Sequence, residues 1–188
     1  MKKNRGIFLD RDGVVNASPG QGFVTNWRDL SFLPGTLQAL KRLRRSGFKV
    51  IVISNQSAVG RGLMGLRTLR QITNEMLTAI QKAGGGLDAV YYCPHHPEAG
   101  CSCRKPKVGL LKKAARKYSI DLTKSFVIGD SRTDIQMGKK AGCTALLVLS
   151  GKINRRSLPA LGLPRDRVFG NLLQATRWIL RQETRLPG

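Results

Sequence analysis

Two aspartates, Asp10 and Asp12, directly follow the apolar run 7–9 and precede Gly13. A strand that ends in two carboxylates two residues apart can direct both at one point, and the glycine lets the backbone turn away. One carboxylate can act as a nucleophile or metal ligand while the other carries a proton. This spacing favours a phosphoryl-transfer site. Because it also occurs in metal-binding loops and solvated turns, other segments are needed to distinguish these interpretations.

A second apolar run, 126–128, is followed by a glycine and then by two acids, Asp130 and Asp134. Asp130 can complete an oxygen-rich Mg²⁺ site with the carboxylate of Asp10 and the backbone carbonyl of Asp12, because Mg²⁺ prefers oxygen ligands. Asp134 can pair with a nearby lysine. Taken alone, either acid is slightly better explained as the cap of the helix that follows.

A third apolar run, 51–53, ends in Ser54, Asn55 and Gln56. A hydroxyl and amides at the end of a strand can donate hydrogen bonds to a phosphoryl oxygen, together with exposed backbone N–H groups. We therefore regard these three residues as candidates for phosphate or substrate binding. The same residue types are also ordinary at the start of a loop.

Three of the four cysteines and both histidines of the chain fall within residues 93–103. A Cys-x-His pair and a Cys-x-Cys pair supply the four ligands of a closed tetrahedral Zn²⁺ site. We assign the zinc ligands as Cys93, His95, Cys101 and Cys103. His96 is the alternative histidine, and a loop of reduced thiols is the alternative to a metal site. Closed coordination leaves no position for water, so we expect this zinc ion to be structural. Cys143 is expected to be a small buried residue.

The elements between these motifs must position them. Short β-rich runs alternate with helical patterns, which predicts βαβ units and a parallel sheet with helices on both faces. The expected strands are 6–9, 49–54, 89–92, 125–128 and 144–149. The expected helices are 35–45, 66–82, 108–118, 134–141 and 172–181. The predicted fold class is α/β, a three-layer Rossmann-like fold with a central parallel sheet, in which ligands bind beyond the carboxyl ends of the strands.

Two further segments have no settled interpretation. The long connection 16–32 carries Pro19, Phe23 and Trp27 and either folds over the site as a substrate-contacting loop or packs as a surface loop with an aromatic anchor. Both interpretations fit the residues. The segment 152–188 shows no motif that we can interpret.

The composition is typical of one globular domain. With 188 residues and 41% hydrophobic content, the chain can bury one good core, so we expect a single domain over 1–188 with a zinc-binding loop at 93–103. The longest apolar runs are far too short to cross a bilayer, and no signal-peptide pattern is present. We expect a cytoplasmic monomer without membrane contact, in which the cysteines are metal ligands or buried thiols rather than disulfides.

The net charge of +22 is the compositional outlier, with 33 Lys and Arg against 11 Asp and Glu. Such a balance can indicate a nucleic-acid partner, attraction of anionic small substrates, or a generally basic surface. The basic residues are spread along the chain, for example in 41–45, 112–113, 116–117, 139–140 and 155–156. This spread favours a solvated basic surface over a nucleic-acid track. Nucleic acid stays open as a less favoured partner.

The order of the motifs, an Asp-x-Asp-Gly, a strand ending in Ser, a lysine and a Gly-Asp-x₃-Asp, resembles the haloacid dehalogenase superfamily of phosphatases over roughly residues 6–150. More narrowly, the segments 8–16, 54–56 and 103–106 resemble the branch that contains D-glycero-D-manno-heptose-1,7-bisphosphate 7-phosphatase and histidinol-phosphate phosphatase. The resemblance implies the haloacid dehalogenase fold without a large cap domain, Mg²⁺ as a cofactor and a structural zinc ion. It also implies Asp10 as the nucleophile and Asp12 as the acid and base.

For the remaining motif residues, the resemblance implies that Ser54 and Lys105 bind the phosphoryl group and that Asp130 holds Mg²⁺. Arg104 would help to recognise the substrate, and the zinc ion would shape the loop that delivers Arg104 and Lys105. The expected reaction is hydrolysis of a small sugar phosphate through an aspartyl phosphate. Heptose 1,7-bisphosphate, at its 7-phosphate, is the favoured substrate.

Three rival functions stay open at this point. Histidinol-phosphate phosphatase is the nearest, and the short loop between His95 and Cys101 does not separate it from the heptose enzyme. The absence of a following dehydratase domain weakens it. A polynucleotide 3′-phosphatase would explain the charge, but that group is not expected to carry a zinc loop. A basic nucleic-acid-binding module without activity would leave the four aspartates of the motifs without a role.

Overall fold

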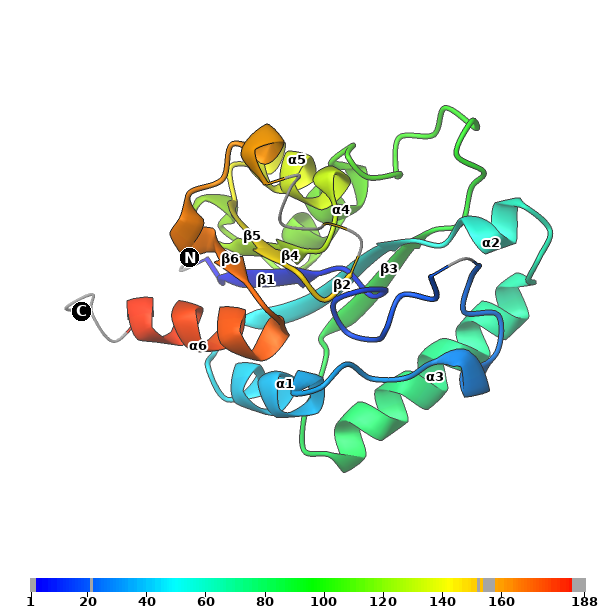
Figure 1. The fold of residues 1–188 in the computed structure, drawn as a ribbon, viewed down its shortest axis with the longest axis horizontal. Helices are drawn as coiled ribbons and strands as arrows, with labels where there is room; N and C mark the ends of the chain where they lie inside the picture. Colours follow the sequence, from blue (N-terminus) through cyan, green and yellow to red (C-terminus); the bar gives the residue numbers. More distant parts are fainter. Residues whose placement is uncertain (1–2, 21, 152, 154–157, 184–188) are drawn as a thin grey trace.

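A six-stranded parallel sheet forms the centre of the computed structural model, which describes residues 3–20, 22–151, 153 and 158–183 (Figure 1). The strand order is β3-β2-β1-β4-β5-β6, and every pairing is parallel. The strands are β1 (Gly6–Leu9), β2 (Lys49–Asn55), β3 (Ala89–Cys93), β4 (Phe126–Gly129), β5 (Thr144–Val148) and β6 (Val168–Phe169).

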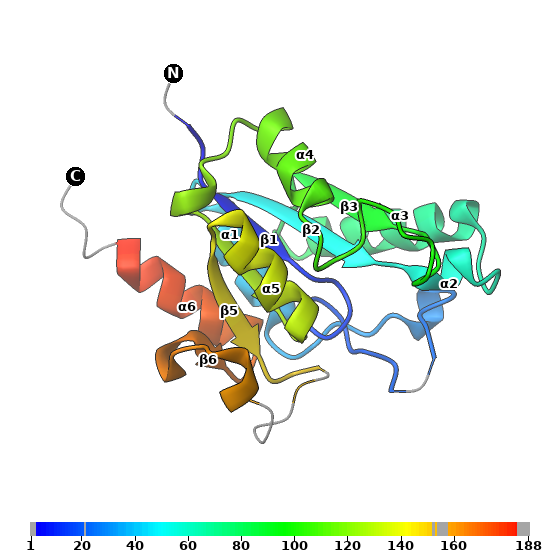
Figure 2. The ribbon, with the colours of Figure 1, turned by 90° about the horizontal axis from the view of Figure 1, so that it is seen from above.

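Helices cover both faces of this sheet, which makes three layers (Figures 1 and 2). One face carries α1 (Thr36–Arg44), α3 (Leu66–Lys82) and α6 (Leu172–Glu183), and the other carries α4 (Gly109–Lys117) and α5 (Arg132–Ala141). A single-turn helix, α2 (Ser57–Gly60), directly follows β2. Short 3₁₀ turns lie at Trp27–Asp29, Leu122–Lys124, Pro159–Leu161 and Arg165–Arg167.

The central strand β1 shows why the sequence folds into three layers. All four of its residues are buried, because a parallel strand covered by helices on both faces meets no solvent. Ile7 and Leu9 pack into the core beneath α1, α3 and α6, whereas Phe8 packs into the core beneath α4. The alternation of side chains along a strand therefore supplies both cores from one short apolar run.

The predicted α/β class, parallel sheet and helical layers are confirmed, whereas several boundaries differ. The helix expected at 134–141 begins at Arg132, and the strand expected at 125–128 is shifted by one residue to Phe126–Gly129. Two elements have no counterpart among the predicted ones, namely α2 and β6. Each is only four or two residues long, too short for a periodic hydrophobic pattern to appear.

No large cap domain is inserted between the strands in the part of the chain that the structure describes, and no helix there is long and apolar enough to span a membrane. The basic pair at 155–156 and the end of the uninterpreted segment 152–188, residues 184–188, lie outside the described residues. The connections that follow β1, β2 and β4 all leave the sheet at the same edge, and there the candidate site is found.

Candidate active site

Three neighbouring strands bring the acidic and polar motifs together. Leu9 of β1 is in register with Val52 of β2 and with Ile128 of β4, so the residues just beyond them converge at one edge of the sheet. A cavity of about 570 Å³ opens there. It is lined by Asp10, Asp12, Ser18, Pro19, Gly20, Gly22, Phe23, Ser54, Asn55, Ser57, Arg104, Lys105, Ser131, Arg132 and Thr133. This volume is typical of a small-molecule site.

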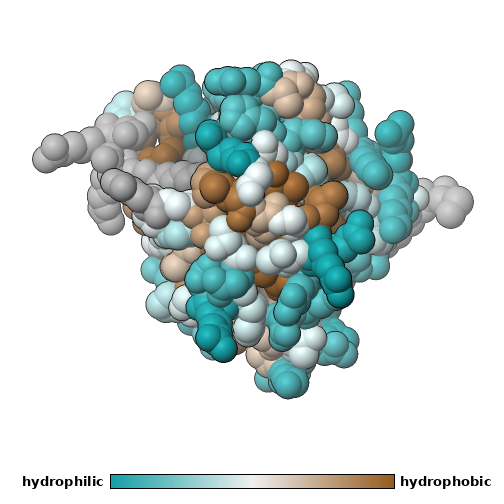
Figure 3. Space-filling view, turned by 90° about the vertical axis from the view of Figure 1, so that its right-hand side faces the viewer, coloured by the Kyte–Doolittle hydropathy of each residue, from teal (hydrophilic) through white to brown (hydrophobic). Residues whose placement is uncertain are grey.

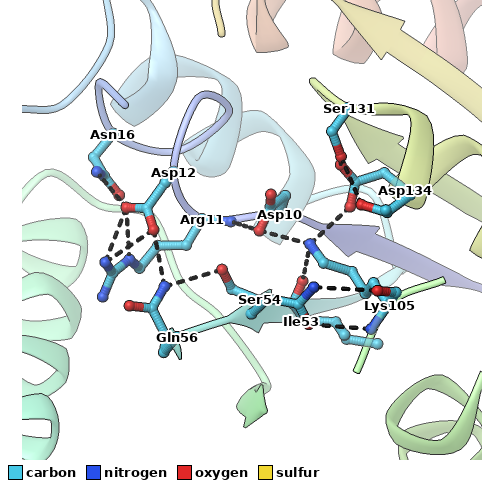
Figure 4. Close-up of polar contacts among 12 residues, drawn as sticks. Asp10, Arg11, Asp12, Asn16, Ile53, Ser54, Gln56, Lys105, Ser131 and Asp134 are labelled. Carbon is cyan, nitrogen blue, oxygen red and sulfur yellow. Dashed lines mark hydrogen bonds and ion pairs between the residues drawn. The ribbon is translucent and has the colours of Figure 1, made fainter. Parts of the chain in front are cut away.

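Lys105 joins two of the carboxylates, Asp10 and Asp134 (Figure 4). Its buried Nζ lies 2.8 Å from Asp10 Oδ1 and 2.7 Å from Asp134 Oδ1, and it donates a hydrogen bond of 3.0 Å to the carbonyl of Ile53. Asp10 also accepts a hydrogen bond of 2.7 Å from the backbone N–H of Arg11. Asp134 thus has the lysine partner that its position in the sequence suggested.

The charges of this group are strongly interdependent. Burial raises the pKa of Asp10, an effect that Lys105 opposes and that Asp134 reinforces. Burial disfavours the charged form of Lys105, but Asp10 and Asp134 outweigh it and raise the pKa of this lysine above its usual range. Lys105 is therefore a permanent cation beside the carboxylate of Asp10.

Asn55 is one of the lining residues, but its side-chain amide is bonded to Lys105 and positions it. Its side-chain oxygen accepts a hydrogen bond of 3.1 Å from the backbone N–H of Lys105, and its Nδ2 donates one of 3.3 Å to the Lys105 carbonyl. The amide thus satisfies both peptide groups of one residue, as a neighbouring strand would. The end of β2 thereby fixes where the lysine enters the site.

Asp12 is surrounded by hydrogen-bond donors. Its Oδ1 accepts from Arg11 Nε at 3.0 Å, Arg11 Nη2 at 2.9 Å and Asn16 Nδ2 at 2.9 Å. Its Oδ2 accepts from Arg11 Nη2 at 3.0 Å and from Gln56 Nε2 at 2.8 Å, and Gln56 also donates to Ser54 Oγ at 3.1 Å. Gln56 does not line the cavity, so its contact is with the acid and not with the space where a phosphate would lie.

Asp130 is fully buried and tightly enclosed by two glycines. A Cβ at Gly13, which has a φ of +89°, would lie 2.3 Å from Asp130 Oδ2, and a Cβ at Gly151 would lie 1.9 Å from the same atom. Carboxylate oxygens of Asp10, Asp130 and Asp134 lie within 4.8 Å of one another. Hard oxygen donors at this spacing fit a Mg²⁺ ion with Mg–O distances of about 2.1 Å after small side-chain movements.

The cysteine and histidine motif forms a second cluster, between β3 and Lys105. His95 Nδ1 lies 3.1 Å from Cys103 Sγ and 3.6 Å from Cys93 Sγ, and the sulfur of Cys101 lies within 3.6 Å of both other sulfurs. A tetrahedron with Zn–S bonds of about 2.3 Å has edges of about 3.8 Å, so the donor set fits zinc. His96 lies outside the cluster and faces Glu98 instead.

Without a cation, the neighbouring sulfurs act in opposite directions on two of these thiols. Burial raises the pKa of Cys101, but hydrogen bonds with Cys103 and Cys93 outweigh it and lower this pKa to about 6. Burial and the neighbouring sulfurs raise the pKa of Cys103 to about 12. A divalent cation removes this conflict because it binds thiolates and stabilises their charge. Cys143, whose pKa burial alone raises to about 12, lies apart from the cluster in the core between α4 and the sheet.

The connection 16–32 borders the cavity and also carries an aromatic anchor. Ser18, Pro19, Gly20, Gly22 and Phe23 line the cavity, so this segment forms one of its walls. Trp27 and Phe32 pack edge to face with ring centroids 6.4 Å apart and anchor the end of the same segment.

Comparison with known proteins identifies the family. A family model described as HAD-hydrolase-like matches residues 102–175. A D-glycero-beta-D-manno-heptose-1,7-bisphosphate 7-phosphatase of Bordetella bronchiseptica is 40% identical over 177 residues, which cover 94% of this chain and 98% of that protein. The chain belongs to the HAD-like phosphatases. An enzyme of the same name from Helicobacter pylori (strain 26695) is 39% identical and covers 75% of this chain and 81% of its own length.

Solved structures of HAD-like phosphatases show the same architecture. The crystal structure of the B. bronchiseptica D,D-heptose 1,7-bisphosphate phosphatase, complexed with magnesium and phosphate, has a TM-score of 0.87 to this chain and covers 95% of it and 99% of itself. The corresponding phosphatase from Burkholderia thailandensis is 32% identical with a TM-score of 0.70, and covers 96% of this chain and 99% of itself.

Sequence reasoning overlooked two residues of this HAD-like phosphatase site, Arg11 and Asn16. Arg11 lies between two acids in the sequence and looks like a solvated turn residue, yet it is fully buried and its guanidinium also lies 5.8 Å from the ring of Tyr92. A fully buried arginine requires a charged partner, which Asp12 supplies. The sequence signal that could have indicated this buried arginine is a cation placed between two acids at the end of a strand. Asn16 gave no signal, because its contact depends on the turn that follows Gly13.

The face of the phosphatase that carries α2 is not uniformly basic. Figure 3 shows apolar side chains near the centre of this face, surrounded by hydrophilic ones. Two leucines here are largely exposed: Leu63, between α2 and α3, is 57% exposed, and Leu66, the first residue of α3, is 50% exposed. A nucleic-acid track needs a continuous run of cations along the phosphate backbone, and the apolar centre interrupts one here.

Proposed function

We propose that this phosphatase removes the 7-phosphate from D-glycero-β-D-manno-heptose 1,7-bisphosphate with the help of Mg²⁺. The observation that carries the proposal is the position of Asp10, a carboxylate that lines the cavity and has Lys105 Nζ at 2.8 Å. The identity of 40% to the B. bronchiseptica heptose enzyme, over nearly the full length of both chains, supports the choice of substrate.

In the proposed reaction, Asp10 attacks phosphorus in line and forms an aspartyl phosphate, while the leaving sugar oxygen takes a proton from Asp12. Asp12 then takes a proton from the water that hydrolyses this intermediate. Because both oxygens of Asp12 accept hydrogen bonds from Arg11 and Gln56, the acid has to give up at least one of these contacts to reach the leaving group. Bound Mg²⁺ supplies charge neutralisation at the phosphoryl oxygens.

Two polar side chains of the cavity lining support the same step. Lys105 Nζ lies beside the nucleophile, where it can offset the charge of the transferred phosphoryl group. Ser54, whose Oγ lines the cavity and accepts from Gln56, keeps its own proton available for a phosphoryl oxygen. Asp130 and Asp10 are the carboxylates that we propose to hold Mg²⁺, together with the backbone carbonyl of Asp12. Asp134 offers a third carboxylate nearby.

We further propose that Cys93, His95, Cys101 and Cys103 hold a structural zinc ion. The cluster supports this role because its four donors can close a tetrahedron and so leave no position for a reacting water. The loop that it closes leads directly into Arg104 and Lys105. The proposed zinc ion thus acts on the reaction only by fixing where these two cations lie.

We also propose that the enzyme acts in carbohydrate metabolism in the cytoplasm. We propose that it does so as a monomer and without a nucleic-acid partner. One panel of phosphate release tests the proposed activity, with heptose 1,7-bisphosphate, histidinol phosphate and a 3′-phosphorylated oligonucleotide as substrates at equal concentration. We expect the bisphosphate to have the highest kcat/KM by at least about tenfold, a difference of about 1.4 kcal/mol in transition-state binding. Preferential hydrolysis of either other substrate would overturn the substrate assignment.

A further inference from the structure

Tyr92 is a partly buried phenol to which the proposed reaction gives no role. It lies in β3, in register with Ser54 of β2, and packs against the core beneath α1, α3 and α6. The guanidinium carbon of Arg11 lies over its ring, 5.8 Å from the ring centroid. Arg11 in turn donates to Asp12 through Nε and Nη2. Only one side chain therefore separates Tyr92 from the carboxylate that is proposed to carry the proton.

The hydroxyl of Tyr92 is held by helix α3. Thr73 Oγ1 donates its single proton to the carbonyl of Leu69, at 2.7 Å. The Tyr92 hydroxyl lies 3.0 Å from the same Oγ1 and therefore has to donate to it, because a threonine hydroxyl has no second proton to give. The phenolic oxygen keeps its lone pairs as an acceptor. Two hydrogen bonds thus connect the backbone of α3 to the ring over which Arg11 lies.

The guanidinium of Arg11 has one end that Asp12 does not satisfy. Its Nη1 is buried and has no hydrogen-bond partner within the described residues. A buried donor without an acceptor is costly, and the electron-rich face of a tyrosine ring offsets part of that cost for a cation. Burial disfavours the charged form of Arg11, but Asp12 and then Tyr92 outweigh burial and raise the pKa of this arginine. Burial raises the pKa of Tyr92, so the phenol stays neutral.

We propose that Tyr92 is a positioning residue for proton transfer, which holds the guanidinium of Arg11 in place while Asp12 moves. Asp12 has to give up at least one of its contacts to reach the leaving group. Arg11 stays where it is during this movement only if a group other than Asp12 also holds it, and Tyr92 is placed to do so. This inference rests on the proposed function, which it deepens by naming a residue that acts through another.

The test compares leaving groups that do and do not need a proton, by the rate of leaving-group release in a single turnover with enzyme in excess. Tyr92→Phe removes only the hydroxyl and should slow release of the sugar from heptose 1,7-bisphosphate by about 3- to 10-fold, the range expected for one hydrogen bond. Release from p-nitrophenyl phosphate should change by less than about twofold, because nitrophenolate leaves without a general acid. Equal losses on both substrates would overturn the proposal.

A double-mutant cycle shows whether Tyr92 acts through Arg11. In the Arg11→Lys background, Tyr92→Phe should slow sugar release by less than about twofold, because the guanidinium that the phenol holds is gone. Thr73→Val should reproduce part of the loss, whereas Thr73→Ser keeps the hydroxyl and should stay close to the wild type. Tyr91→Phe is the matched control, since this neighbouring tyrosine of β3 packs into the core on the other face of the sheet. A full loss in the lysine background would overturn the proposal.

Asp12→Asn, measured in the same way, separates failure of this inference from failure of the proposed function. If Asp12→Asn loses sugar release selectively and Tyr92→Phe does not, the inference alone is wrong. If Asp12→Asn slows both leaving groups equally, Asp12 is not the acid, and both proposals fail. If the wild type does not hydrolyse heptose 1,7-bisphosphate, fructose 1,6-bisphosphate replaces it as the sugar-phosphate probe. The substrate assignment then fails, and a selective loss in Tyr92→Phe would still support the role of the tyrosine.

Discussion

The guanidinium of Arg11 forms a buried ion pair with the carboxylate of Asp12, with Nη2 2.9 Å from Oδ1. The two residues are adjacent in the chain, so the pair forms within a single turn after β1. Arg11 is fully buried, and the arginine therefore defines one fixed resting position for the acid that we propose to carry the proton.

Arg11→Lys should lower kcat by about 10- to 100-fold, because an ammonium group cannot make the two-pronged contact that orients Asp12. KM should change much less, since Arg11 does not line the cavity. Gln56→Met, which removes one donor from the same carboxylate, should give a smaller fall in kcat. Steady-state kinetics and thermal melting check both variants, with the exposed Arg28→Lys as the control. An unchanged kcat in both variants would show that Asp12 does not need this cluster.

Asp10→Asn should abolish measurable turnover while the fold persists, because an amide does not attack phosphorus and is a poorer ligand for Mg²⁺. Asp12→Asn should slow turnover by about 10²- to 10⁴-fold, the usual contribution of a general acid and base. Phosphate release is the measurement, and circular dichroism shows whether each variant is folded. Turnover at the wild-type rate in either variant would refute its proposed role.

Removal of zinc should lower activity by about 10- to 100-fold even at saturating Mg²⁺, because the loop that delivers Arg104 and Lys105 loses its anchor. Metal analysis of the purified protein should find one tightly bound zinc per chain, and Cys101→Ser and Cys103→Ser should lose it. Cys143→Ser is the matched control, because this buried thiol lies outside the cluster and should leave the zinc content unchanged. Purified protein without zinc would contradict the assignment.

Gly129→Ala should destabilise the protein by about 1–3 kcal/mol or more, because overpacking at this point has no room to relax. A Cβ at Gly129 would lie 2.1 Å from the Cβ of Asp134, which is itself held by Lys105. The exposed Gly20→Ala, which meets no atom within 4 Å, should have little effect. Urea unfolding monitored by fluorescence measures both. Equal stability of the two variants would mean that α5 can move away from β4 without cost.

Long periodic segments and short motifs were predictable from the sequence, because the pattern that indicates each of them lies within a few neighbouring residues. Strand β1 has the predicted bounds, and α3 spans Leu66–Lys82 as its hydrophobic pattern indicated. Residue type and spacing pointed to the pair Asp10 and Asp12, to Asp130 and to the cysteine cluster. The oligomeric state, by contrast, stays a prediction.

Contacts between side chains far apart in the chain could not be predicted in the same way. Asn55 lines the cavity, where it was expected to bind phosphate or substrate, but its bonds to the peptide groups of Lys105, 50 residues away, could not be foreseen. Gln56 likewise contacts Asp12, 44 residues away. An amide offers both a donor and an acceptor, so only the three-dimensional neighbours determine which group it serves.

The cysteine-bearing loop is fastened at both ends, since Cys93 closes β3 and the peptide groups of Lys105 are bonded to Asn55 at the end of β2. Its tip, residues 96–100, contributes no ligand to the cluster and no residue to the cavity lining. His96 packs closely against Gly60, and the carbonyl of Gly100 accepts from Lys107, so the exposed pair Glu98 and Ala99 is the point where extra residues would project into solvent. The tip is thus a place where evolution or a protein engineer can change the length of the chain without disturbing catalysis.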